Sequence, residues 1–214
     1  PLLEEVVFEE GSTLEKIGQY AFGECTSLKR LELPISLIEV GDAFLFNCQS
    51  LEYLKTPFIG NQRENDINNY SAKDVFVNMF TVGDYLQYKS IPESIQTVEV
   101  YDIDMMHNVT FYNAKNIKKI ILPDKLDNIG IRSFYGCESL EEFIVPDEIT
   151  IVKESCFQNC SSLKRIVIPA SVKTIKKDAF KNCEALEEVI YLGNISDLVI
   201  EVGNEKFESV LNYK

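Results

Sequence analysis

The chain has 214 residues, of which 45% are hydrophobic and 26% charged, an ordinary composition for a globular protein. The formal net charge is −13, and a field of that sign repels phosphate backbones and anionic lipid, so we expect no nucleic-acid partner. No apolar run approaches the roughly 18 residues of a membrane-spanning helix, so we expect no membrane insertion.

The sequence repeats with a period of 23 residues. The period is marked by Cys25, Cys48, Cys137, Cys160 and Cys183, and Ala114 stands one period before Cys137. These six are the reference positions. Apolar columns lie three and six residues after them: Leu28, Leu51, Ile117, Leu140, Leu163 and Leu186, then Leu31, Leu54, Ile120, Phe143, Ile166 and Val189.

Each repeat predicts a short strand and a return stretch. In chain order, the first strand holds Leu3, Val6 and Phe8, later strands follow the columns, and residues 95–100 form a strand with a weakened lead-in, giving eight rungs. Proline ends several of these strands because it lacks a backbone donor. The return stretch predicts a short helical turn with an aromatic column: Phe22, Phe134, Phe157 and Phe180. One repeat cannot bury its apolar residues alone, so we predict stacked rungs with strands ~4.8 Å apart.

The units IGQYAFGECTSLKRLELP, IGIRSFYGCESLEEFIVP and IKKDAFKNCEALEEVIYLG resemble the BspA-like (Treponema pallidum type) leucine-rich repeats. The resemblance covers nearly the whole chain. It implies an α/β fold class: a right-handed solenoid with a parallel β-sheet on the concave face and short helical or irregular turns on the convex face. It also implies a secreted or surface-attached bacterial protein, with an insertion like those of gut Firmicutes versions.

We therefore predict one solenoid domain over residues 1–214. Its parts are N-terminal repeats (1–57), an irregular insertion (58–91), C-terminal repeats (92–192) and a capping element that the resemblance implies (193–214). The insertion holds several aromatic residues, which either recognise a ligand or fill the core where the repeat lapses. They are Phe58, Tyr70, Phe76, Phe80, Tyr85 and Tyr88.

Charges on the outward strand positions change sign from rung to rung. Lys118-Lys119, for example, is followed by Glu141-Glu142 and then by Lys164-Arg165. Opposite charges that face each other on neighbouring strands are stabilising, so these residues predict ladders that fix the stacking register. The alternative is a charged ligand groove.

A second outward column, seven residues after the reference position, turns apolar in the C-terminal half of the chain. Contiguous exposed apolar residues often mark an interaction site, although β-branched residues also simply favour strands. Because the concave face of a solenoid is its usual binding platform, we predict binding there. The candidate residues are Tyr53, Lys55, Glu99, Ile121, Ile144, Val167 and Ile190.

The six cysteines predict buried thiols, because one column accepts Ala114 in place of cysteine and free cysteine is commonly buried. A disulfide between Cys156 and Cys160 is the alternative. Zinc would require close cysteine pairs or nearby histidines, and the only histidine, His107, lies in an acidic, methionine-containing segment that we interpret as a turn. We expect no metal, no cofactor and no catalytic site.

Taken together, these features predict a non-catalytic protein-interaction or adhesion module. It would bind a protein or glycan through the concave strand face and the 58–91 loop. The alternative is a structural spacer attached to a separate, possibly enzymatic, domain. We expect a monomer located outside the cell or on its surface, with an export signal that lies outside these residues.

Overall fold

The computed structural model describes residues 2–61, 76–81 and 91–213. The chain divides into two compact units, Pro1–Ile103 and Asp104–Lys214, which are described separately. The boundary falls inside residues 92–113, where the repeat is weakest in sequence. None of the helices in the described ranges has the length and apolar character needed to cross a bilayer.

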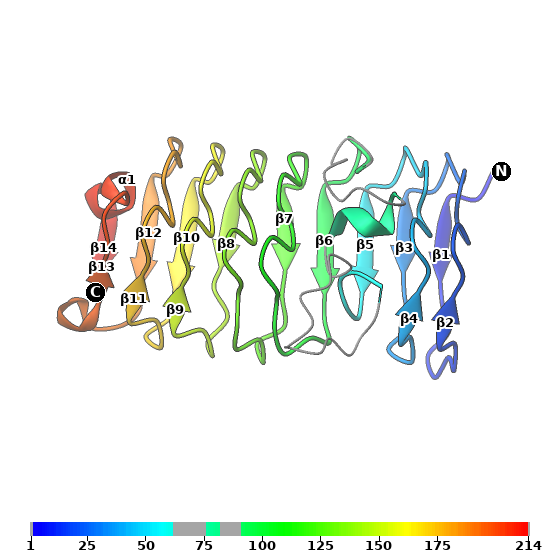
Figure 1. Cartoon of the computed structure of the whole chain (residues 1–214), viewed down its shortest axis with the longest axis horizontal. Helices are drawn as coiled ribbons and strands as arrows, with labels where there is room; N and C mark the ends of the chain where they lie inside the picture. The colour runs from blue at the N-terminus through cyan, green and yellow to red at the C-terminus, as the bar shows by residue number, and fades with distance from the viewer. Residues whose placement is uncertain (1, 62–75, 82–90, 214) are drawn as a thin grey trace. The chain divides into compact units, whose positions relative to one another are not determined.

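The first unit is a coil with a main row of parallel strands and a second row of very short ones (Figure 1). The main row is β1 (Glu5–Val7), β3 (Arg30–Glu32), β5 (Tyr53–Thr56) and β6 (Thr97–Val100). The second row is β2 (Lys16–Ile17) paired with β4 (Glu39–Val40). A 3-10 helix, η1 (Phe76–Met79), belongs to the insertion.

The second unit repeats this plan. Its four-stranded main sheet contains β8 (Glu142–Ile144), β10 (Arg165–Ile168), β12 (Glu188–Tyr191) and β14 (Leu211–Tyr213), all parallel, and β7 (Lys119–Ile121) precedes β8 along the chain. Its second row is β9 (Ile151–Val152), β11 (Thr174–Ile175) and β13 (Val199–Ile200). The last rung also carries η3 (Ile195–Asp197) and the single described α-helix, α1 (Glu205–Ser209).

The predicted stacking of equivalent positions is confirmed. In the first unit Arg30 pairs with Tyr53, and in the second Arg165 pairs with Glu188 on one side and Glu142 on the other, each one period away. Tyr53 pairs with Thr97, so β6 resumes the columns after the insertion. The chain therefore forms a leucine-rich-repeat solenoid of parallel strands.

Of the predicted short helical or irregular turns, the return stretches take the irregular form, with tight turns and two-residue strands. Two columns in each return take positive φ, which interrupts any helix since L-residues adopt the left-handed region only singly. One column is Tyr20, Ala43, Val109, Arg132, Ser155 and Asp178, and the other is Glu24, Asn47, Asn113, Asn159 and Asn182. The second row of strands was not predicted, because two residues carry too little alternation to be recognised.

Phenylalanine rings stack along the core of the second unit. The centroids of Phe134 and Phe157 lie 5.0 Å apart, and those of Phe157 and Phe180 lie 5.2 Å apart, with nearly parallel planes. Phe207 from α1 continues the stack 4.5 Å from Phe180, so the short helix supplies the last aromatic ring of the stack. In the second unit the predicted aromatic column is thus a continuous stack from Phe134 to Phe180, whereas Phe22 in the first unit lies edge-on to Phe44 at 6.5 Å.

The cysteines are buried thiols, as predicted. The Sγ atoms of Cys48, Cys160 and Cys183 each donate to the carbonyl of a phenylalanine in the preceding rung at 3.1 Å, and Cys137 does so at 3.3 Å. Cys156 is also buried and unbridged. These thiols join rungs together and are shielded from reagents.

The aromatic residues at the described ends of the insertion are buried: Phe58, Phe76 and Phe80 are each at most 1% exposed. For these three the core-filling interpretation holds. The other three aromatic residues singled out in the insertion, Tyr70, Tyr85 and Tyr88, lie outside the described residues.

Replacing Phe157 by Ala should lower the free energy of unfolding of the second unit by about 3–5 kcal/mol, because the change removes the ring between two stacked neighbours and leaves a cavity. Urea denaturation measures the loss. Ile131→Ala, at a position 39% exposed, is the matched control and should change stability by well under half as much. Equal effects of the two substitutions would contradict the stacked core.

The thiols should react with Ellman's reagent only after unfolding. Burial raises the pKa of the Cys48 and Cys183 thiols to about 12, so little thiolate exists at neutral pH, and the reagent cannot reach the sulfur. We expect near-zero labelling of the native chain and six equivalents in denaturant. Rapid native labelling, or fewer than six equivalents under non-reducing denaturation, would be inconsistent with buried free thiols.

Candidate binding surface on the main strand row

Strand alternation places two columns of side chains on the outer face of the main strand row. In β8, for example, Phe143 is buried between exposed Glu142 and Ile144. The seven candidate residues named from sequence all lie at such outer positions, three of them in the first unit and four in the second. Each group is described within its own unit.

The structure brings Tyr53, Lys55 and Glu99 together in the first unit. The Tyr53 hydroxyl donates to Glu99 Oε2 at 2.7 Å, and Lys55 Nζ lies 2.8 Å from Glu99 Oε1. The Arg30 guanidinium covers the Tyr53 ring, with Cζ 4.0 Å from its centroid, and Arg30 also pairs with Glu32. The charges in this polar network satisfy one another, so it leaves little free charge for a ligand.

Electrostatics within the polar network follow from these contacts. Burial raises the pKa of Tyr53 to about 12, and its hydrogen bond to the Glu99 carboxylate acts in the same direction. For Glu99, partial burial alone would raise the pKa, but hydrogen bonds from Lys55 and Tyr53 and the ammonium charge outweigh it, so the pKa lies below its ordinary value. Both groups are therefore held in the protonation state that keeps the network intact at neutral pH.

The apolar column in the second unit is exposed unevenly. Ile144 is 68% exposed and Ile121 37%, whereas Val167 and Ile190 are half-buried. Ile144 is among the most exposed large apolar side chains described. The surface is therefore most apolar at β7 and β8.

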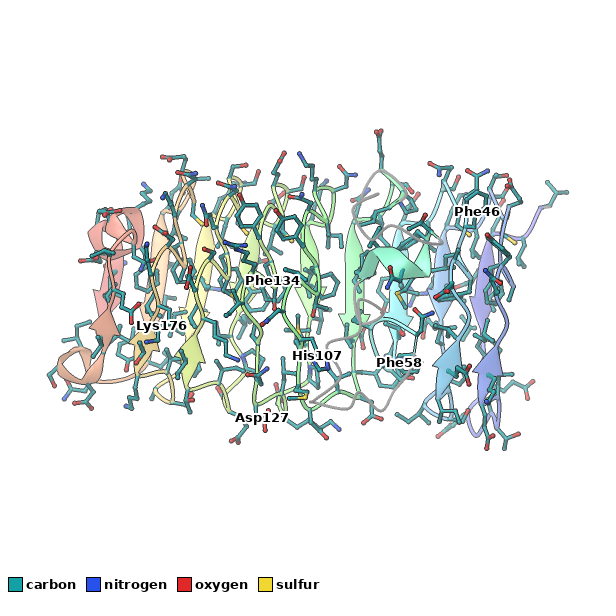
Figure 2. All side chains as sticks on the ribbon, viewed as in Figure 1. Phe46, Phe58, His107, Asp127, Phe134 and Lys176 are labelled. Carbon is teal, nitrogen blue, oxygen red and sulfur yellow. The ribbon has the colours of Figure 1, made fainter. Side chains whose placement is uncertain are left out.

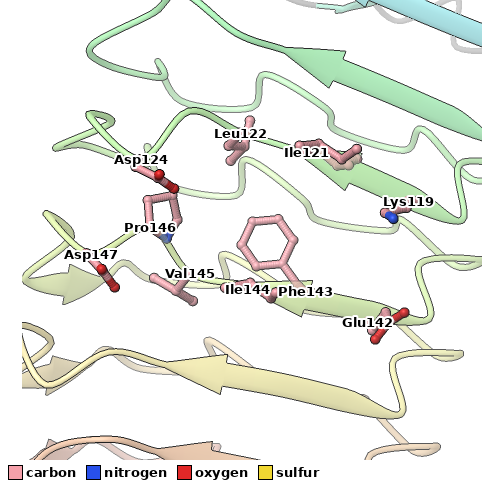
Figure 3. Close-up of a pocket in the computed structure, with 11 residues that line it drawn as sticks. Lys119, Ile121, Leu122, Asp124, Glu142, Phe143, Ile144, Val145, Pro146 and Asp147 are labelled. Carbon is pink, nitrogen blue, oxygen red and sulfur yellow. The ribbon is translucent and has the colours of Figure 1, made fainter.

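A groove of about 480 Å³ lies between β7 and β8. At their beginnings the two segments remain joined, since Glu141 N–H donates to the Lys118 carbonyl at 3.3 Å. Further along they separate: β7 is not part of the sheet that contains β8 (Figure 3). The volume is within the range typical of small ligand sites. Sequence reasoning missed this groove.

Phe143 forms the core side of the groove. It stands in an inward column where the other rungs carry only aliphatic residues, and its ring packs 4.9 Å from Phe134 and 5.0 Å from Phe157. Leu122 is only half-buried and lines the groove, whereas its equivalents Val145 and Ile168 in the following rungs are buried. The phenylalanine in an aliphatic column was the available sequence signal.

Ion pairs join neighbouring rungs, as the alternating charges predicted. Lys29 and Arg30 contact Glu4 and Glu5 at 3.1 and 3.3 Å, and Arg165 contacts Glu188 at 2.7 Å. These pairs are solvent-exposed, so each contributes little to stability. The exception is Lys118-Lys119, which forms no ion pair among the described residues, because Glu141 and Glu142 contact Lys164 and Arg165 instead.

Metal chemistry has no support in the described ranges, where no three His, Cys, Asp or Glu side chains gather as a metal site. His107 lies in a turn region, half-buried, next to Met106, which is buried (Figure 2).

A family profile described as "BspA type Leucine rich repeat region" matches residues 2–102 and 73–212, in six copies. The chain belongs to this family. No curated protein matches it. A leucine-rich repeat protein from Bacteroides ovatus superposes with a TM-score of 0.52 at 22% identity, covering 94% of this chain and 51% of that one. The Treponema pallidum leucine rich repeat protein TpLRR also gives 0.52, at 14% identity, covering 100% and 86%.

This BspA-type chain thus spans about half the length of the Bacteroides ovatus protein. A protein titled "leucine rich cell surface protein" from Faecalibacterium prausnitzii has a TM-score of 0.44 at 21% identity, covering 91% of this chain and 61% of that one. The two structures with a TM-score of 0.52 support the solenoid fold and, at these identities, the fold alone.

Glu99→Gln should reduce the stability of the first unit by about 1 kcal/mol at neutral pH, because it removes the charge that Lys55 and Tyr53 contact. A carboxyl with a lowered pKa stabilises the fold above its ordinary value of 4.5, and that contribution is lost as pH falls through the lowered pKa. The stability gap between wild type and variant, measured by urea denaturation across pH, should therefore close in acid.

Glu52→Gln is the matched control, since Glu52 is an exposed carboxylate directly before the neighbouring strand β5 and makes no described ion pair. It should leave stability within a few tenths of a kcal/mol. If wild type and Glu99→Gln do not differ in stability at neutral pH, or if their difference in stability persists unchanged in acid, the network is not electrostatically stabilising.

Proposed function

We propose that this BspA-type chain is a non-catalytic interaction module that binds a macromolecular partner through the outer face of its main strand row. The observation that carries the proposal is Ile144, an isoleucine that is 68% exposed on a rigid strand and lies beside Ile121 at the edge of a groove. Burying such side chains in a complex contributes favourable free energy, roughly 25 cal/mol per Å² of apolar area.

The rigid strand row supports this proposal. The outer side chains project from strands whose backbones are hydrogen-bonded in the sheet β8–β10–β12–β14, so little conformational entropy is lost when a partner docks. In the insertion, the described aromatic residues are buried in the core, so the proposal rests on the strand row. The family resemblance also leads us to propose an extracellular or cell-surface location.

Ile144→Glu should weaken binding to a true partner by at least tenfold while leaving the fold intact, because the side chain is exposed and contributes little to the core. The measurement is surface plasmon resonance against a panel of extracellular-matrix proteins and glycans, with circular dichroism to confirm folding. Val199→Glu, at a position 59% exposed on β13 in the second row of the same unit, is the control. Partner binding that responds equally to both substitutions, or to neither, would reject the outer face of the main row.

A further inference from the structure

The groove between β7 and β8 has a polarity that limits what can occupy it. We infer that it binds an extended peptide segment in which an acidic residue, an apolar residue and a basic residue follow one another along the groove. This inference rests on the proposed function and names the class of partner. The acidic end lies at Lys119, the apolar side chain between Ile121 and Ile144, and the basic end at Asp124 and Asp147.

Backbone groups inside the groove are available to a peptide. The group concerned is the N–H of Leu122, which among the described residues makes no hydrogen bond to the Ile144 carbonyl. In other rungs the equivalent N–H donates to the next strand: Leu33 N–H to the Lys55 carbonyl at 2.9 Å, and Val145 N–H to the Val167 carbonyl at 3.0 Å. An extended peptide satisfies open strand groups of this kind with its own amides, as in strand addition to a sheet edge.

The middle of the groove is aliphatic. Ile121, Leu122, Ile144 and Val145 line it, and Phe143 forms its inner wall (Figure 3). An apolar peptide side chain placed here is removed from water against several apolar groups at once, which is the arrangement found at interface hot spots. A glycan, whose surface is dominated by hydroxyl groups, would leave them without partners against these side chains.

Charges differ between the two ends of the groove. At the beginning of the strands stands Lys119, whose ammonium makes no described ion pair, and the nearby Glu142 carboxylate lies 4.0 Å from Arg165 Nη1. At the other end stand Asp124 and Asp147, both exposed and outside every described ion pair (Figure 3). Residues 119–124 span the groove, so a peptide of about five or six residues at ~3.3 Å each reaches from one end to the other.

The inference is tested by fluorescence anisotropy on the whole chain. The probes are labelled hexapeptides with two acidic, two apolar and two basic residues in that order, together with the reversed order, since the groove can be entered in either chain direction. A scramble of each peptide, with alternating charges and separated apolar residues, serves as the composition control. We expect an ordered peptide to bind at least tenfold more tightly than its scramble.

Two variants locate the binding. Lys119→Glu should weaken binding of the ordered peptide about tenfold. It should improve binding of a peptide with basic residues at both ends, because the reversed charge now favours a cation. Lys177→Glu removes an exposed lysine elsewhere in the same unit and should leave both affinities unchanged. Ordered peptides that bind no better than scrambles, or a Lys119→Glu variant that behaves like Lys177→Glu, would overturn the inference.

The same experiment separates this inference from the proposed function. If Ile144→Glu weakens the binding of a partner from the protein and glycan panel but no ordered peptide binds, the strand row is an interaction surface and the peptide inference is wrong. If Ile144→Glu affects neither kind of ligand, the proposed function fails as well.

Discussion

Backbone hydrogen bonds between parallel strands hold equivalent side chains of successive rungs in columns, and the other features of both units depend on that register. Column stacking places each leucine against the next, brings the rings of Phe134, Phe157 and Phe180 face to face, and lets four of the cysteines donate to the phenylalanine carbonyl of the rung before them. It also decides which charges meet. A single displaced pair of strands therefore alters packing, charge pairing and surface shape together.

At β7 and β8 the register is interrupted, because β7 is not part of the sheet that contains β8. Beside the groove Lys119 makes no described ion pair, the outward Ile144 is exposed and Leu122 is half-buried. The groove is thus apolar in its middle with charges outside every described ion pair at its two ends, and in our proposal this part of the strand row is a binding surface.

Much of the fold could be predicted from the sequence because the 23-residue period is a property of many positions at once. The strands, the buried thiols, the aromatic column and the outward direction of Ile144 all follow from it. The return stretches could not, because a two-residue strand has no alternation and left-handed residues such as Ala43 and Val109 are not recognisable from their type. The groove was missed for a different reason: the period identifies what rungs share, and the groove arises where one rung departs from them.

The pairing of Tyr53 with Thr97 carries a further consequence. The position of a residue in the stack depends on its column and not on how many residues separate it from the previous rung along the chain. An inserted segment of any length is therefore compatible with the stack if it leaves and re-enters the coil at the same column. Between β5 and β6 the chain can therefore change in length during evolution without shifting an outer side chain of either strand, provided that Phe58, Phe76 and Phe80 still fill the core. Evolution of this segment is thus constrained by packing and not by length.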